Sequence, residues 1–456
     1  MPSLLPFLFL TLIPPLTQDP NRFDMGLFES PSLGETPSKG EYLIYHKGEG
    51  KPGKGYFKKH EPGEIAEFHL FVPEAANPQS KSGKKSKRRR KSSKKNKGTP
   101  KKCPLIIVYH GGKDGGSGKG LAKKMSRLST KEHPLIVLSP NMYTVDSYKE
   151  LIAEGKYPID ENLVFVMGFS SGGMGVLSAM KEGGSKDSGF RPQFLASMST
   201  TASYGRNPYP EAPYYVVAGE RETAEYVKHP LLKTRRKTCR RHAIGMQQVI
   251  KDVSYVEVPG KGHSCGSPLH MALLQNLIRS IPVFEIDKSL GKVPEEFRAL
   301  ADLGRAGRWE DLAKARQEAE GAEKKSAQRR FHSFDRKLML SLRKWLESEV
   351  KTVVKLKGKG SRLAVTRVLN TEPYLPGLLK LFEGHKDLEK LEKALSQLDS
   401  LPWWQRELEA RKQYREIASS QPGESSKEAL QKLRKEFKGT VFGDHRAQQM
   451  LLAYEL

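Results

Sequence analysis

Short apolar runs alternate with helix-compatible stretches through the middle of the chain. From residue 104 onward the apolar residues fill whole runs, as is typical of strands buried on both faces of a parallel sheet, whereas in the earlier segment 64–72 they alternate with polar ones. The expected strands are 41–45, 64–72, 104–110, 135–138, 163–167, 194–198, 214–217 and 255–258. Helices are expected between them at 120–128, 171–181, 240–251 and 269–278. This alternation predicts an α/β fold with a doubly wound, mostly parallel sheet.

The pattern changes after about residue 284. Residues 293–350 and 377–456 are rich in Ala, Leu, Glu, Lys and Arg, and their apolar positions have helical spacing. The clearest stripe is formed by Leu388, Leu391, Leu395 and Leu398. We therefore predict an α/β domain over residues 41–283 and an all-α domain over residues 284–456.

The N-terminus is apolar over a short length. Between Leu4 and Leu16 only Thr11 is polar, which suits the core of a signal peptide and is too short for a membrane span. No Lys or Arg precedes this core, so a simple apolar tail on a cytoplasmic protein is the alternative. We expect a signal peptide at 1–18, a secreted or periplasmic protein, and a Pro/Gly/Ser-rich linker at 19–40.

Positive charge is concentrated in one segment. The chain of 456 residues has a formal net charge of +26, and 13 Lys or Arg lie between Lys81 and Lys102 without any acid. Residues 77–102 contain almost nothing that could be buried, so they are predicted to be a disordered insert. The segment could bind an anionic polymer or surface, or remain a solvated loop. Without interleaved aromatic residues, specific nucleic-acid binding is not expected.

A candidate nucleophile lies between an expected strand and an expected helix. Gly168-Phe-Ser170-Ser171-Gly172 fits the pattern Gly-x-Ser-x-Gly, in which small neighbours allow a strained strand-to-helix turn. The frame of the motif makes Ser170 the nucleophile. Ser171 is the competing candidate, and the motif gives it a backbone N–H role in the oxyanion hole.

A second N–H donor is expected from the loop after the strand 104–110. This loop reads His110-Gly111-Gly112, and glycines let a backbone approach a ligand closely. Either Gly111 or Gly112 is the expected donor. His110 is expected to orient the loop.

A base and an acid follow two later strands. His263 lies in a glycine-bracketed loop and is the histidine after Ser170 that directly follows a buried strand. Glu220 and Glu222 follow the strand 214–217, between the serine and the histidine in chain order, where an acid that orients the histidine is expected.

No metal or organic cofactor is expected. The three cysteines, Cys103, Cys239 and Cys265, are too few for a disulfide framework and lack metal-ligand spacing. Cys239 and Cys265 could form one disulfide.

Together these motifs resemble the α/β-hydrolase superfamily, and most closely bacterial esterases similar to polyhydroxybutyrate depolymerases, feruloyl and acetyl-xylan esterases and carboxylesterases. The elements that match, in order, are His110-Gly-Gly, Gly168-Phe-Ser-Ser-Gly-Gly, Gly219-Glu-Arg-Glu and Gly262-His. The resemblance covers residues 41–282 and implies a Ser170–His263–Glu222 triad, with Glu222 in place of the more usual aspartate. It implies a serine hydrolase that cleaves carboxylic esters, small or polymer-linked, through an acyl-enzyme. A peptidase on the same fold and a non-catalytic polyanion-binding protein are the alternatives.

Overall fold

The computed structural model describes most of the chain after residue 34. It covers residues 35–45, 68–77, 102–111, 118–185, 188–200, 212–222, 235–250, 252–284, 286–321, 325–356, 362–420 and 422–455. Its strands are β1 (Gly40–Tyr45), β2 (Phe68–Pro73), β3 (Cys103–Tyr109), β4 (Ile136–Pro140), β5 (Ile159–Phe169), β6 (Pro192–Met198), β7 (Tyr214–Gly219) and β8 (Val253–Val258). Each of the expected strands is present, with ends shifted by a few residues.

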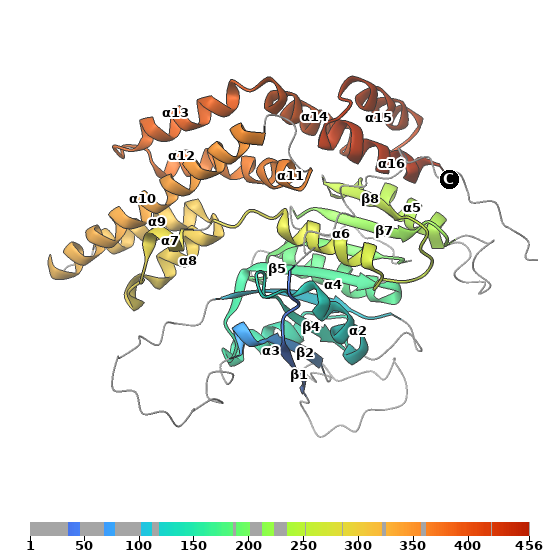
Figure 1. The fold of residues 1–456 in the computed structure, drawn as a ribbon, viewed down its shortest axis with the longest axis horizontal. Coiled ribbons are helices and arrows are strands. Elements are labelled where there is room, and N and C mark those ends of the chain that lie inside the picture. The colour runs from blue at the N-terminus through green and yellow to red at the C-terminus, as the bar shows by residue number, and fades with distance from the viewer. Residues whose placement is uncertain are drawn as a thin grey trace, which may run out of the picture.

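The strands form one sheet in the order β1-β2-β4-β3-β5-β6-β7-β8 (Figure 1). β2 pairs antiparallel with both β1 and β4, and every later pair is parallel. The order folds back at β3 and then runs outward from β5 to β8, which is the topology of the α/β-hydrolase fold. The predicted fold class is therefore confirmed.

Helices cover both faces of the sheet. They are α2 (Gly118–Met125), α3 (Asp146–Glu154), α4 (Gly173–Gly184), α5 (Arg235–Met246) and α6 (Pro268–Arg279). Buried side chains of α3, α4 and α5 share one hydrophobic core, and those of α2 and α6 share the other. The sequence pattern predicted four of these five helices; α3 was not among them.

Only helices follow α6 in the described part of the chain, as the pattern predicted. They are α7 (Asp287–Leu290), α8 (Arg298–Ala306), α9 (Trp309–Glu320), α10 (Lys325–Leu356), α11 (Arg362–Thr371), α12 (Leu375–Leu381), α13 (Leu388–Asp399), α14 (Pro402–Ala418), α15 (Glu424–Glu436) and α16 (Ala447–Tyr454). A π-helical turn, Val441–Arg446, precedes α16. Phe284 begins this half, with its ring packed against Trp309, Trp345 and Tyr374.

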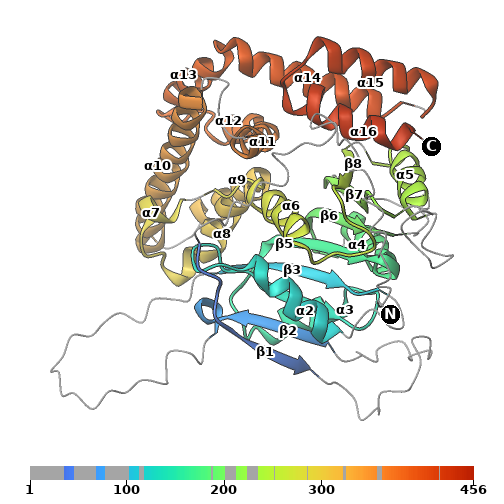
Figure 2. The ribbon, with the colours of Figure 1, turned by 45° about the vertical axis from the view of Figure 1, so that its right-hand side comes forward.

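The last helices lie along the free edge of the sheet, next to β8 (Figures 1 and 2). The Tyr414 hydroxyl donates to the carbonyl of Val253 at 2.8 Å. The buried Arg446 donates to Ser254 Oγ and to the Tyr215 hydroxyl, and its guanidinium lies 5.0 Å from the Tyr215 ring centroid. An exposed edge strand is a template for unwanted pairing, so this cover protects β8.

The two ends of the predicted insert and part of the predicted linker are described. Lys102 forms an ion pair of 2.9 Å with Asp302, which joins the start of β3 to α8. Nη1 and Nη2 of Arg279 donate to the two carboxylate oxygens of Glu35, at 2.8 and 2.7 Å. Residues 35–39 are thus held against α6. The expected signal peptide at 1–18 and residues 78–101 lie outside the described residues.

All three cysteines are free and buried. The disulfide considered between Cys239 and Cys265 is therefore absent. Burial raises the pKa of the Cys265 thiol to about 11. Across the residues that the structure describes, no helix combines the length and the apolar character that crossing a bilayer requires.

One buried carboxyl group makes the stability of the helical half depend on pH. Both oxygens of Glu407 accept from the backbone N–H of Val441, at 3.2 and 2.9 Å, and the side chain is buried. Burial raises the pKa of Glu407 from 4.5 to about 7. Between these two values the folded protein keeps a proton that the unfolded chain releases, so stability falls as pH rises from 4.5 to 7.

We predict that Glu407→Gln removes this loss. The variant should gain up to about 3 kcal/mol relative to the wild type between about pH 4.5 and pH 8, measured as urea midpoints at each pH. Glu409→Gln, at an exposed site on the same helix, is the matched control and should show no such gain. The prediction would be contradicted if the difference in unfolding free energy between Glu407→Gln and wild type stayed the same at every pH in this range.

Candidate active site

Ser170 lies at the sharp turn between β5 and α4. β5 ends at Phe169, Ser170 begins a single 3-10 turn, and α4 starts at Gly173. Ser170 has a φ of 55°, a conformation that costs a non-glycine residue about 1–3 kcal/mol. Strain of this kind is found at functional sites, and here it holds the side chain at the carboxyl edge of a parallel sheet, where α/β folds bind their ligands.

The glycines around Ser170 permit backbone contacts that no side chain would allow. A Cβ atom on Gly168 would lie 2.2 Å from the carbonyl oxygen of Gly172. A Cβ atom on Gly172 would lie 2.2 Å from the carbonyl oxygen of Tyr109, at the end of β3. The turn is therefore packed directly against the neighbouring strand.

The loop after β3 approaches the serine equally closely. A Cβ atom on Gly111 would lie 2.5 Å from Cβ of Ser170 and 2.6 Å from the carbonyl oxygen of Phe169. The backbone of Gly111 is thus beside the candidate nucleophile, where an oxyanion donor is required. Gly112, the other expected donor, lies outside the described residues.

Tyr143 connects the two candidate oxyanion loops, and sequence reasoning missed it. Its hydroxyl donates to the carbonyl of His110 at 3.2 Å and lies 2.9 Å from Oγ of Ser171. It comes from the loop after β4, and no motif marks it. Only the folded sheet brings this hydroxyl between Ser171 and His110.

His110 is buried beneath the same loop. Burial lowers the pKa of its ring, and the Tyr143 ring lies 6.3 Å away between centroids. A buried imidazole of lowered pKa is neutral at pH 7. The orienting role of His110 stays a prediction.

His263 and Glu222 form a pair beside the turn. Nδ1 of His263 lies 2.8 Å from Oε1 of Glu222, and the Phe169 ring, next to Ser170 in the chain, lies 4.7 Å from the His263 ring between centroids. A carboxylate oxygen accepts from an imidazole N–H, so Nδ1 is the donor in this contact and Nε2 takes no part in it. Glu222 is fully buried, which strengthens its interaction with a histidine cation.

Glu220 has a different contact from Glu222. Its Oε2 accepts from the backbone N–H of Gly260 at 2.8 Å, in the loop that leads to His263. The N–H of Arg221 also donates to the carbonyl of Lys261 at 2.8 Å. Glu220 thus fixes the histidine loop, while Glu222 contacts the imidazole itself.

A second strained serine lies next to Ser170. In the parallel pairing of β5 and β6, Phe169 is opposite Met198, so Ser199 follows at the same level of the sheet as Ser170. Ser199 has a φ of 52° and is buried, and its N–H donates to the carbonyl of Val217 at 2.7 Å. We assign Ser199 no chemical role, because its hydrogen bond to Val217 joins backbone groups only.

The solved structures that the chain resembles include several esterases and a serine hydrolase. An esterase from Pyrobaculum calidifontis is 14% identical and covers 54% of this chain and 87% of its own, with a TM-score of 0.32. Fungal esterases of Rhizomucor miehei are 11% identical and cover 54% and 86%, with a TM-score of 0.35. Fluorophosphonate-binding serine hydrolase F of Staphylococcus aureus is 13% identical and covers 53% and 97%, with a TM-score of 0.33. No protein-family model matches the chain, and no curated protein does either.

We predict that Gly168→Ala destabilises the protein, because its Cβ atom would collide with the carbonyl of Gly172 and with Val176. The loss should be at least about 2 kcal/mol in urea unfolding. Gly120→Ala in α2, where a Cβ atom meets nothing within 4 Å, is the matched control and should stabilise by about 0.5–1 kcal/mol. Equal stabilities of the two variants would show that the turn tolerates a side chain.

Proposed function

We propose that this protein is a serine esterase that hydrolyses carboxylic esters through an acyl-enzyme on Ser170. The observation that carries the proposal is the strained turn at Ser170, with Gly111 against Ser170 and the ring of the adjacent Phe169 against His263, which pairs with Glu222. Acyl transfer requires a nucleophile, a base and an oxyanion donor, and the serine, the paired histidine and the nearby backbone N–H groups are candidates for these three parts.

Each group has one role in the proposed reaction. Oγ of Ser170 attacks the ester carbonyl while Nε2 of His263 removes its proton, and the N–H groups of Ser171 and Gly111 bind the oxyanion. The imidazolium then protonates the leaving alcohol. A water molecule, activated by the same nitrogen, hydrolyses the acyl-enzyme and restores Ser170.

Glu222 stabilises the imidazolium without taking its proton. Its full burial and its 2.8 Å contact with Nδ1 support this role. Tyr143 supports the site from the side of the oxyanion loops, because one hydroxyl contacts both Ser171 and His110. Because Tyr143 joins the two loops, the N–H groups of Ser171 and Gly111 keep a constant separation. Oxyanion stabilisation depends on this fixed placement of its donors.

The proposal is tested by the hydrolysis of p-nitrophenyl acetate and butyrate. Ser170→Ala should lower kcat by about 10³-fold or more, because no other group can form the acyl-enzyme. Ser171→Ala is the matched control, since it keeps the backbone N–H of residue 171 and loses only the hydroxyl contact with Tyr143, and it should lower kcat by about tenfold or less. A wild-type rate from Ser170→Ala, or an equal loss from Ser171→Ala, would refute the assignment of the nucleophile.

The two carboxylates provide a second test on the same assay. Glu222→Gln should lower kcat by about 10²–10⁴-fold, because it removes the charge that stabilises the imidazolium. Glu220→Gln should change kcat by less than about tenfold, because it weakens only one hydrogen bond to the loop. The reverse order of effects would make Glu220 the acid of the site.

A further inference from the structure

Glu257 is a fully buried carboxylate that the proposed reaction does not use. It is the last residue but one of β8, and in the parallel pairing with β7 it lies opposite Ala218. The loop of His263 follows β8, and the turn of Glu222 follows β7. Glu257 therefore lies close to the ends of the two strands that lead to the candidate base and acid.

The charged partners of Glu257 come from the first turns of α5. Arg236 forms a two-point ion pair with it, in which Nε donates to Oε1 at 2.9 Å and Nη2 donates to Oε2 at 2.7 Å. Arg240 donates to Oε1 from Nε at 3.0 Å and from Nη2 at 2.8 Å. Burial opposes ionisation of Glu257, but the hydrogen bond from Arg236 and the charges of both arginines lower the pKa of this carboxyl below its usual range. Glu257 is therefore an anion at pH 7, and Arg236 binds both of its oxygens.

Arg236 also holds the candidate acid, through its backbone. The N–H of Arg236 donates to the carbonyl oxygen of Glu222 at 3.3 Å, and the N–H of Glu222 donates to the carbonyl of Gly219 at 3.1 Å. The side chain of Arg236 thus binds the strand that leads to the candidate base, while its backbone binds the candidate acid. One residue connects the two.

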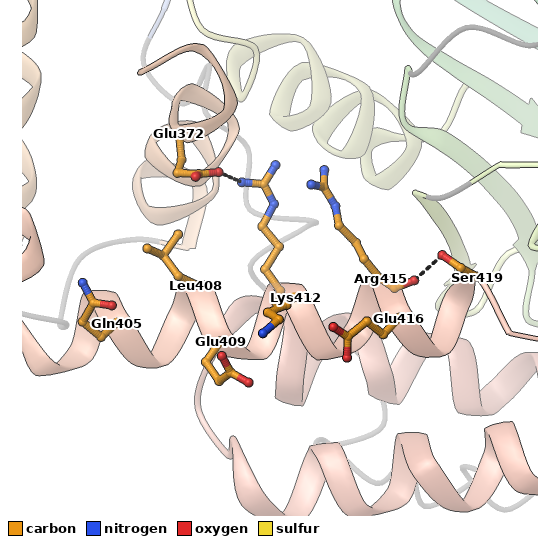
Figure 3. Close-up of a pocket in the computed structure, with 9 residues that line it drawn as sticks. Glu372, Gln405, Leu408, Glu409, Lys412, Arg415, Glu416 and Ser419 are labelled. Atoms are coloured by element: carbon orange, nitrogen blue, oxygen red, sulfur yellow. Dashed lines mark hydrogen bonds and ion pairs between the residues drawn. The ribbon is translucent and has the colours of Figure 1, made fainter. Parts of the chain in front are cut away.

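The strand that Arg236 binds is anchored at both ends. Asp252, immediately before β8, pairs with Arg415 of α14 at 3.6 Å. Figure 3 shows Arg415 extending from α14, where it lines a hollow of about 920 Å³. Near the other end of β8, the N–H of Glu257 donates to Oε1 of Gln449 in α16 at 3.3 Å. A rigid support of this kind is what the placement of a catalytic group requires.

We propose that Arg236 is a positioning residue, which keeps Glu222 in contact with His263 by binding Glu257 with its side chain. The inference rests on the proposed esterase function, in which Glu222 stabilises the imidazolium. A buried ion pair adds little net stability, because the desolvation of both charges offsets their attraction. A two-point pair between a guanidinium and a carboxylate nevertheless fixes geometry, because two parallel hydrogen bonds set the orientation of both groups.

The first test compares ester hydrolysis by wild type and variants. Arg236→Gln should lower kcat by about 10- to 100-fold and change KM by less than about threefold, because only the acid loses its fixed place. The double variant Arg236→Gln/Glu222→Gln should be no slower than Glu222→Gln, since Arg236 acts through Glu222. Arg236→Lys keeps the charge without the fork, so it should restore part of kcat and serves where Arg236→Gln does not fold.

Arg240→Gln is the matched control. It removes the other arginine from the same carboxylate and leaves both contacts of Arg236 in place. The side chain of Arg240 is 8% exposed and that of Arg236 is 18% exposed, so Arg240→Gln should lower Tm at least as much. It should change kcat by less than about threefold. Lys237→Gln, at an exposed position of the same helix, should match wild type in both measurements.

Proton NMR tests the positioning role without any turnover. The Nδ1 proton of His263, donated to the buried carboxylate of Glu222, should resonate far downfield of the amide protons in wild type. The resonance should be absent from Glu222→Gln, weaker in Arg236→Gln and unchanged in Arg240→Gln. A wild type that shows this resonance but hydrolyses no ester would contradict the proposed function and leave the positioning of Glu222 standing.

Three results would overturn the positioning role. The first is a wild-type resonance in Arg236→Gln. The second is a double variant in which the two losses of kcat multiply, because Arg236 would then act apart from Glu222. The third is an equal loss of kcat from Arg236→Gln and Arg240→Gln, which would indicate a general loss of stability.

Discussion

The architecture of the candidate site depends on one close contact between backbones. The end of β3 and the turn after β5 approach so closely that Gly172 has no room for a side chain against Tyr109, nor Gly111 against Ser170. This contact keeps Ser170 in its left-handed conformation and brings a backbone segment beside it. The surrounding sheet supplies the rigidity, because β3 and β5 pair from Leu105 to Tyr109 in continuous parallel register.

The helical half completes the same sheet at its other edge. Arg446, Tyr414 and the turn before α16 contact β7 and β8, and these two strands carry Glu222 and His263 on the loops at their ends. The buried Glu257 on β8 binds Arg236 and Arg240 of α5, and Arg240 also contacts the backbone of Glu455 after α16. The chain after residue 284 is therefore part of the structural support of the strands that hold the candidate base and acid.

The sequence predicted all eight strands of the described sheet and the turn at Ser170, because both depend on local patterns: buried apolar runs and glycines at fixed spacing. It left Glu220 and Glu222 open until a family resemblance favoured Glu222, since both follow the same strand; the 2.8 Å contact of Glu222 with His263 separates them. Tyr143 was not predicted, because its partners lie far away in the chain. Contacts such as Tyr143 with Ser171 exist only once the sheet has formed.

The most direct test of the central claim is covalent labelling with a fluorophosphonate probe, followed by fragmentation of the labelled peptide to locate the adduct. The probe reacts with an activated serine, so the account predicts one adduct per chain on Oγ of Ser170 and none in folded Ser170→Ala. An adduct on Ser171 would move the nucleophile by one residue. No adduct on the folded wild-type protein would contradict the account as a whole.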